Sequence, residues 1–119
     1  MKNFSFSRNE RLKKYSQIKP VLMNGKKHCG KFANLYVKTN NASMTRLGIV
    51  VLSKSFRGRA VQRNRVKRLV REFYRLNKCN IVKGVDVVFK VFLSYAACSH
   101  DDVKINAFNL CKKAGILQG

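Results

Sequence analysis

Side chains able to do acid–base or metal chemistry are few in this sequence of 119 residues, whose carboxylates are Glu10, Glu72, Asp86, Asp101 and Asp102. Hydrolysis of a phosphodiester by two bound metals needs several carboxylates that converge on one site. Asp101 and Asp102 precede an apolar-periodic segment, so we interpret them as the cap of a helix. Asp86 lies at the start of a predicted strand. It could have a structural role or could lie near a cleft. The sequence therefore predicts no catalytic residues.

Histidine and cysteine occur together at two places, His28–Cys29 and Cys98–Ser99–His100–Asp101. Neither has the ligand spacing of a structural zinc site. The remaining cysteines, Cys79 and Cys111, form no CxxC pair, and no secretory signal pattern precedes them. We therefore predict no metal site and reduced thiols, as in a cytoplasmic protein.

The stretch from Arg57 to Arg75, RGRAVQRNRVKRLVREFYR, has the spacing of an amphipathic helix. Its apolar residues fall on one stripe at 100° per residue: Val66, Leu69, Val70, Phe73 and Tyr74. The opposite face is cationic apart from Glu72 and contains Asn64, Lys67, Arg68, Arg71 and Arg75.

Two interpretations of this cationic face are possible. A solvated charged face usually mixes signs, whereas like charges four residues apart repel by a few tenths of a kcal/mol per pair. Arginine also outnumbers lysine here, and its planar fork suits bidentate contacts with phosphate. The pattern favours a helix that binds a nucleic acid over one that only faces water.

The composition supports a polyanionic partner. Twenty-six basic residues against five acidic ones give a formal net charge of +21, which disfavours a compact chain that has no partner of opposite sign. The length and the 45% hydrophobic content predict one folded domain over residues 1–119, with 1–10 as an extended tail. Apolar runs are too short to cross a bilayer, so we predict a soluble cytoplasmic protein.

Periodicity predicts the elements αββαβα, an α+β or α/β sandwich without repeats or linkers. The first helix is predicted to run from an N-cap at Ser16 to Gly25, with Pro20 in its first turn. The two strands that follow are expected to pair as a hairpin. The remaining predicted bounds, in chain order, are strands 31–39 and 46–52, a helix ending near Asn77, strand 85–92 and helix 101–114.

Several strings resemble the protein component of bacterial ribonuclease P. The resemblance centres on Arg63-Asn64-Arg65 with the following Val66-Lys67-Arg68-Leu69, which is similar to that family's RNR signature. The flanking segments that resemble the family are Arg46-Leu47-Gly48-Ile49-Val50, Ser53-Lys54 and Asp86-Val87-Val88-Phe89. The likeness extends in the same order from about Arg11 to Lys113, which makes it far more specific than RNR alone.

The resemblance implies a more definite fold than periodicity does. The family has a central four-stranded sheet with three helices, which implies a short additional strand near residues 27–30. It also implies a left-handed βαβ crossover through the RNR helix, against the usual hand of such connections.

For function, the resemblance implies a ribonucleoprotein enzyme in which the RNA subunit, with bound Mg²⁺, removes the 5′ leader of precursor tRNA. The protein alone would be inactive, and its partners would be ribonuclease P RNA and precursor tRNA, with no membrane and no required protein partner. The RNA contacts implied by the matching motifs are Ser53, Lys54, Arg57, Arg59, Arg63, Asn64, Arg65, Lys67, Arg68 and Arg71.

The resemblance also implies a cleft that holds the leader, with Ile18, Leu22 and Tyr36 as the residues facing it. Family members commonly have phenylalanines where this chain has Ile18 and Leu22, so the cleft is expected to offer less stacking. Tyr36 matches a cleft aromatic and is expected to carry the stacking that remains.

Two other classes of protein share some of these features. A ribosomal or architectural RNA-binding protein would have similar size and charge, but it explains none of the strings above. A helix-turn-helix DNA-binding protein needs a short helix before the basic one, where the sequence predicts a strand. A protein component of ribonuclease P would stimulate cleavage of precursor tRNA by ribonuclease P RNA at low Mg²⁺, and neither of these two classes would.

Overall fold

The computed structural model describes residues 11–12, 14–40, 44–52, 60–92 and 100–117. It contains three α-helices and a four-stranded mixed sheet, which confirms the predicted α+β class and the implied extra strand. The elements are α1 (Tyr15–Asn24), β1 (Lys26–Cys29), β2 (Ala33–Thr39), β3 (Arg46–Val51), α2 (Ala60–Asn77), the 3₁₀ turn η2 (Lys78–Asn80), β4 (Val85–Val91) and α3 (His100–Lys113).

The strand order is β1-β2-β4-β3, so the predicted hairpin between β2 and β3 is wrong. Strand β4 lies between them, antiparallel to β2 and parallel to β3. Its residues Asp86, Val87, Val88 and Phe89 are buried in succession, and a strand buried on both faces belongs in the centre of a sheet. Helix α2 is therefore the crossover of a parallel β3–α2–β4 unit, the unit to which the family resemblance assigns a left-handed connection.

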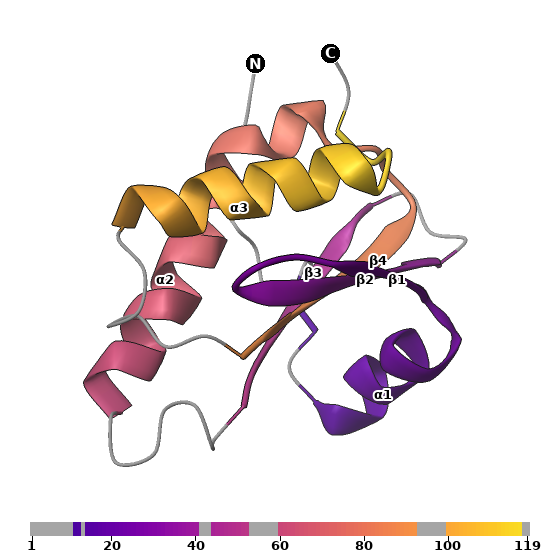
Figure 1. Ribbon diagram of the computed structural model, residues 1–119. Coiled ribbons are helices and arrows are strands. Elements are labelled where there is room, and N and C mark those ends of the chain that lie inside the picture. Colours follow the sequence, from indigo (N-terminus) through magenta and orange to yellow (C-terminus); the bar gives the residue numbers. More distant parts are fainter. Residues whose placement is uncertain (1–10, 13, 41–43, 53–59, 93–99, 118–119) are drawn as a thin grey trace.

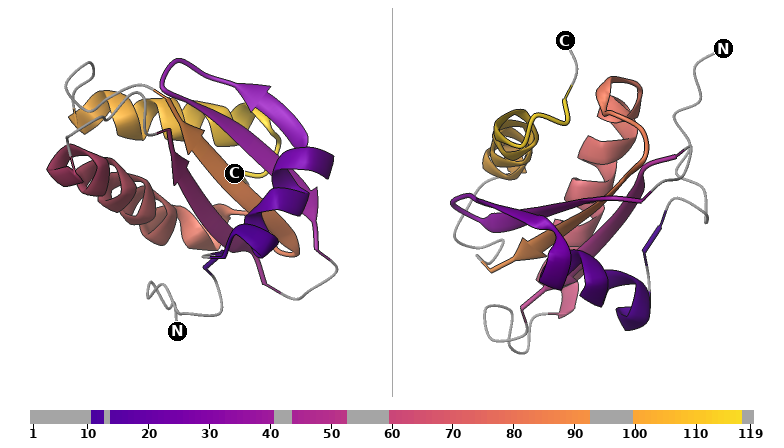
Figure 2. Two further views of the ribbon diagram at one scale, coloured as in Figure 1. Left: turned by 90° about the horizontal axis from the view of Figure 1, so that it is seen from below. Right: turned by 90° about the vertical axis from the view of Figure 1, so that its right-hand side faces the viewer.

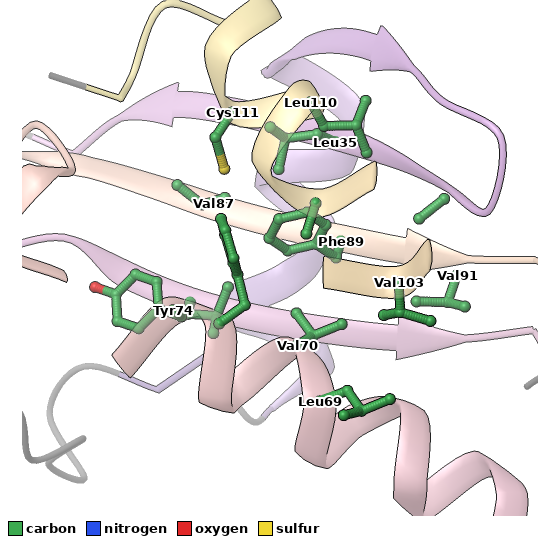
Figure 3. Close-up of a cluster of buried hydrophobic side chains, with 14 of the residues drawn as sticks. Leu35, Leu69, Val70, Tyr74, Val87, Phe89, Val91, Val103, Leu110 and Cys111 are labelled. Atoms are coloured by element: carbon green, nitrogen blue, oxygen red, sulfur yellow. The ribbon is translucent and has the colours of Figure 1, made fainter. Parts of the chain in front are cut away.

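Helices cover both faces of the sheet (Figure 1). Helix α1 packs against β2 and β4 on one face, whereas α2 and α3 lie together against the other, as the two turned views also show (Figure 2). The larger hydrophobic core lies between the sheet and α2 and α3 (Figure 3). A smaller cluster lies under α1.

Helix α2 has the two faces that its sequence predicts. All five residues of the apolar stripe are buried in the larger core. The hydroxyl of Tyr74, at the end of the stripe, donates a hydrogen bond to the carbonyl oxygen of Thr45 at 3.2 Å. This contact ties the C-terminal half of α2 to the start of β3 and leaves the cationic face of the helix outward.

Helix α1 begins earlier than the sequence predicts. Its N-cap is Lys14, whose backbone N–H donates to the Gln17 side-chain oxygen at 3.2 Å, so Ser16 is not the cap. Pro20 is consequently the sixth residue of the helix rather than part of its first turn. The helix ends before Gly25 as predicted, and a Cβ at Gly25 would lie 2.4 Å from the carbonyl oxygen of Val21.

The two aspartates near the start of α3 are not its cap. The helix begins at His100, so Asp101 and Asp102 lie inside its first turn. Carboxylates there still interact favourably with the positive end of the helix dipole, as Lys112 and Lys113 do with the negative end.

Candidate nucleic-acid interface

The outward face of α2 carries six of the ten residues predicted to contact RNA. Asn64, Arg65, Arg68 and Arg71 are exposed, and Arg63 and Lys67 are partly exposed. The other four, Ser53, Lys54, Arg57 and Arg59, lie outside the described residues. We call the set Arg63, Lys67, Arg68 and Arg71 the α2 cationic face.

Positive charges on this face lie close enough to act on one another. The pKa of Lys67 is lowered, first by partial burial and then by Arg63 and Arg71. The pKa of Arg71 is lowered first by desolvation of its guanidinium and then by the charge of Arg11. In both cases a neighbouring positive charge makes the protonated side chain less favourable. A bound phosphate would offset this repulsion at Lys67 and at Arg71.

Arg11 brings a fifth cation to this face from a distant part of the chain. It forms an isolated bridge with Leu47, and the Leu12 backbone N–H donates to the Leu47 carbonyl oxygen at 2.8 Å. The segment thus runs beside the outer edge of β3, within electrostatic reach of Arg71. Sequence reasoning missed Arg11 as a site residue because nothing local relates it to a helix sixty positions later.

Arg75 differs from the other arginines of α2. Its guanidinium forms an ion pair with Glu72 at 2.6 Å, and hydrogen bonding from Arg75 is the main cause of a lowered Glu72 pKa. Both side chains are partly exposed, so the pair contributes little stability. The pair holds Glu72 beside Arg75 at the C-terminal end of the helix, where its carboxylate does not neutralise Arg63 or Lys67.

Asp86 has a structural role, which decides between the two possibilities that the sequence left open. The residue is 6% exposed. Its carboxylate accepts hydrogen bonds from Arg46 Nε at 2.8 Å and from Arg46 Nη2 at 2.7 Å. Asn40 Nδ2 donates to the same carboxylate at 2.8 Å. These contacts join β4 to β3 and to the end of β2, and they leave Asp86 engaged with protein groups.

The predicted leader-facing residues lie under or on α1. Ile18 and Tyr36 are 7% and 8% exposed, and both belong to the small cluster with Val88. Leu22 packs against this cluster but is only partly buried. Leu22 is therefore the only one of the three that is not buried.

Comparison with known proteins decides the family. Residues 6–115 match the family model described as Ribonuclease P. The chain belongs to the ribonuclease P protein family. A ribonuclease P protein component from Clostridioides difficile (strain 630) is 37% identical over 112 residues, covering 93% of this chain and 96% of that protein. One from Syntrophus aciditrophicus (strain SB) is 32% identical over 117 residues, covering 98% and 91%.

Solved structures of the family have the same fold. The RNase P protein from Thermotoga maritima superposes with a TM-score of 0.74 at 31% identity, covering 87% of this chain and 96% of that one. The Staphylococcus aureus RNase P protein gives a TM-score of 0.83 at 24% identity, covering 92% and 98%. The latter likeness concerns the fold alone.

The α1 side of the sheet carries two polar residues that sequence reasoning did not assign to a ribonuclease P site. Asn34 and Lys90 are direct partners across β2 and β4, on the same face as Tyr36 and Val88. Both are partly exposed, unlike Tyr36. The available signal was Lys90 itself, the one cation that interrupts the apolar strand β4.

The close approach of α1 to this face depends on Gly48 in the family's RLG segment. A Cβ at Gly48 would lie 3.1 Å from Leu12 Cβ and 3.3 Å from Ile18 Cγ1. A larger residue would therefore push the helix away from β3. The glycine sets how closely α1 and the segment before it approach the sheet.

Potential metal ligands do not gather in the described part of the chain, where no group of three or more His, Cys, Asp or Glu side chains occurs. Cys29 and Cys79 are free and exposed, and burial raises the pKa of the free Cys111 thiol to about 12. Cys98 lies outside the described residues. Among the helices described, none is sufficiently long and apolar to span a membrane.

Proposed function

We propose that this chain is the protein subunit of a ribonuclease P ribonucleoprotein that removes the 5′ leader of precursor tRNA. The observation that carries the proposal is the α2 cationic face, where Arg63, Lys67, Arg68 and Arg71 lie on one side of the helix and Arg11 adds a further charge close to Arg71. Such a concentration of like charge on a rigid, well-packed helix suits the phosphates of a folded RNA. In this proposal the face binds the RNA subunit.

The leader of the precursor is proposed to lie on the α1 side of the sheet. Leu22 supplies apolar surface there, and Lys90 supplies a cation for a leader phosphate, with Asn34 beside it as a hydrogen-bonding group. Because Ile18 and Tyr36 are nearly buried, their main effect is to support this surface from beneath. Leader binding then depends on phosphate charge and apolar contact more than on stacking.

Hydrolysis is assigned to the RNA subunit with bound Mg²⁺. The donor set of the protein does not fit a two-metal site, because Asp86 is engaged by Arg46 and Asn40, and Glu72 by Arg75. Asp101 and Asp102 lie on α3, and no three side chains of His, Cys, Asp or Glu gather at one place in the described part of the chain. The protein contributes affinity and position, and it works where that RNA works, in the cytoplasm.

Reconstitution tests the proposed function directly. Protein purified free of RNA is expected to leave precursor tRNA intact, because the acids among the described residues do not assemble a metal site. Adding a bacterial ribonuclease P RNA at low Mg²⁺ should give cleavage at the mature 5′ end, faster than with the RNA alone. A ribosomal or architectural RNA-binding protein would give no such stimulation, and cleavage by the protein alone would contradict the proposal.

The substitution Leu22→Phe tests how the leader is held. An added ring at this partly exposed position is expected to strengthen holoenzyme binding to precursor tRNA by about 5-fold or more, because stacking of one base contributes about 1–3 kcal/mol. Mature tRNA lacks the leader, so its affinity should not change. Both dissociation constants are measured for the wild-type and variant holoenzymes.

The matched control is Met23→Phe, which adds a ring to the neighbouring, exposed residue of α1. This variant should bind both RNAs as the wild type does. Equal gains for precursor and mature tRNA, or an equal gain from Met23→Phe, would show that Leu22 does not face the leader.

A further inference from the structure

A groove of about 270 Å³ lies between α3 and the C-terminal end of α2. It is lined by Phe73, Leu76, Asn77, Lys104, Ile105 and Phe108. Leu76, Ile105 and Phe108 are 49%, 56% and 39% exposed, which is unusual for large apolar side chains that lie together. The two helices pack against each other, and α3 crosses α2 at an angle (Figure 1).

Cations flank the apolar floor of this groove. Lys104, Phe108 and Lys112 are spaced four residues apart on α3, so they form one row along the helix. The Nζ atom of Lys112 lies 5.9 Å from the centre of the Phe108 ring. Lys104 is one cause of the lowered Glu72 pKa, but Glu72 is already paired with Arg75. The accessible ring of Phe108 thus lies between Lys104, which lines the groove, and Lys112, one turn further along α3, and the two lysines are about 12 Å apart along the helix axis.

Charge argues against two occupants that the protein itself could supply. A second copy would bring another net charge of +21 to a groove that lysines flank. The segment of residues 1–10 offers Phe4 and Phe6, yet it carries Lys2 and Arg8 against Glu10. The occupant with matching chemistry has a flat apolar surface and a negative charge within a few ångströms of it.

We propose that this groove binds an unpaired RNA nucleotide, with its base on Phe108 and its neighbouring phosphates at Lys104 and Lys112. The inference builds on the proposed function, since it takes RNA as the partner, and adds an RNA site distinct from the α2 cationic face and from the α1 side of the sheet. Aromatic rings flanked by cations are the usual means of holding single-stranded RNA, because every base has a flat face.

The test uses oligouridine as a single-stranded probe and an RNA duplex as a probe without free bases. Both are titrated against full-length protein carrying Arg63→Gln, Arg68→Gln and Arg71→Gln, so that the α2 cationic face contributes little. Adding Phe108→Ala is expected to weaken oligouridine binding by about 5- to 150-fold and to leave duplex binding unchanged. Phe108→Tyr should retain the oligouridine affinity, because it keeps the ring.

The lysines give a second, independent readout. Lys104→Gln and Lys112→Gln should each lower the slope of log K against log salt for oligouridine by about 0.7. Lys83→Gln removes an equal charge from the turn before β4 and should leave the slope unchanged.

An unchanged oligouridine affinity in Phe108→Ala would overturn the proposal, and so would equal losses for oligouridine and duplex. Self-association that depends on Phe108 in sedimentation would assign the groove to a second copy and would also overturn it. None of these results affects the reconstituted cleavage reaction, so failure here is distinguishable from failure of the proposed function.

Discussion

Replacing Arg63, Arg68 and Arg71 together by glutamine is expected to lower the slope of log K against log salt for binding of ribonuclease P RNA by about 2.1 to 2.7. Each phosphate contact contributes about 0.7 to 0.9 to that slope through release of counterions. The ratio of the wild-type affinity for this RNA to the affinity of the variant should therefore fall by about 20- to 40-fold between 50 and 200 mM salt. The measurement is the dissociation constant at a series of salt concentrations.

The fold should survive this change because all three side chains lie on the outward face of α2, away from its buried stripe. The charge-matched control replaces Lys26, Lys31 and Lys83 by glutamine, three exposed lysines on β1 or in turns. It removes the same net charge but should change the slope much less. Equal changes in the two variants would mean that RNA responds to the overall charge of the protein and not to the α2 cationic face.

The substitution Asp86→Ala is expected to lower the free energy of unfolding by about 2–4 kcal/mol. Loss of one partner from a buried ion pair typically costs about 3–5 kcal/mol, and the partial exposure of Arg46 reduces that figure. A chain of this size should then melt roughly 10 °C lower. Thermal and urea unfolding, followed by circular dichroism, give the measurement.

Two comparisons separate this structural role of Asp86 from a catalytic one. Replacing both Arg46 and Asp86 by alanine should cost no more than Asp86→Ala alone, since the double variant leaves neither charge unpaired. The holoenzyme containing Asp86→Ala should cleave precursor tRNA at the wild-type rate, well below its melting temperature. A folded, assembled variant that fails to cleave would show that Asp86 takes part in the reaction.

The sequence by itself determined those features that depend on short-range periodicity. The two faces of α2 follow from residues three and four positions apart, and each residue predicted for its apolar stripe is buried. Val103, Ala107, Leu110 and Cys111 are likewise buried along α3, at the spacing of one helical face. The scarcity of acids and the RNR string with its flanks also needed no structure, because both are properties of composition and order.

The tertiary structure alone decided what depends on contacts between distant segments. Strand β4 separates β2 from β3, because pairing is chosen by burial on both faces of a sheet and not by closeness along the chain. The same packing buries Tyr36 beneath α1, joins Asp86 to Arg46, and brings Arg11 within reach of Arg71. Phe108 and Leu76 line one groove only because α3 returns beside α2, and a helical period read along either segment contains no information about the other.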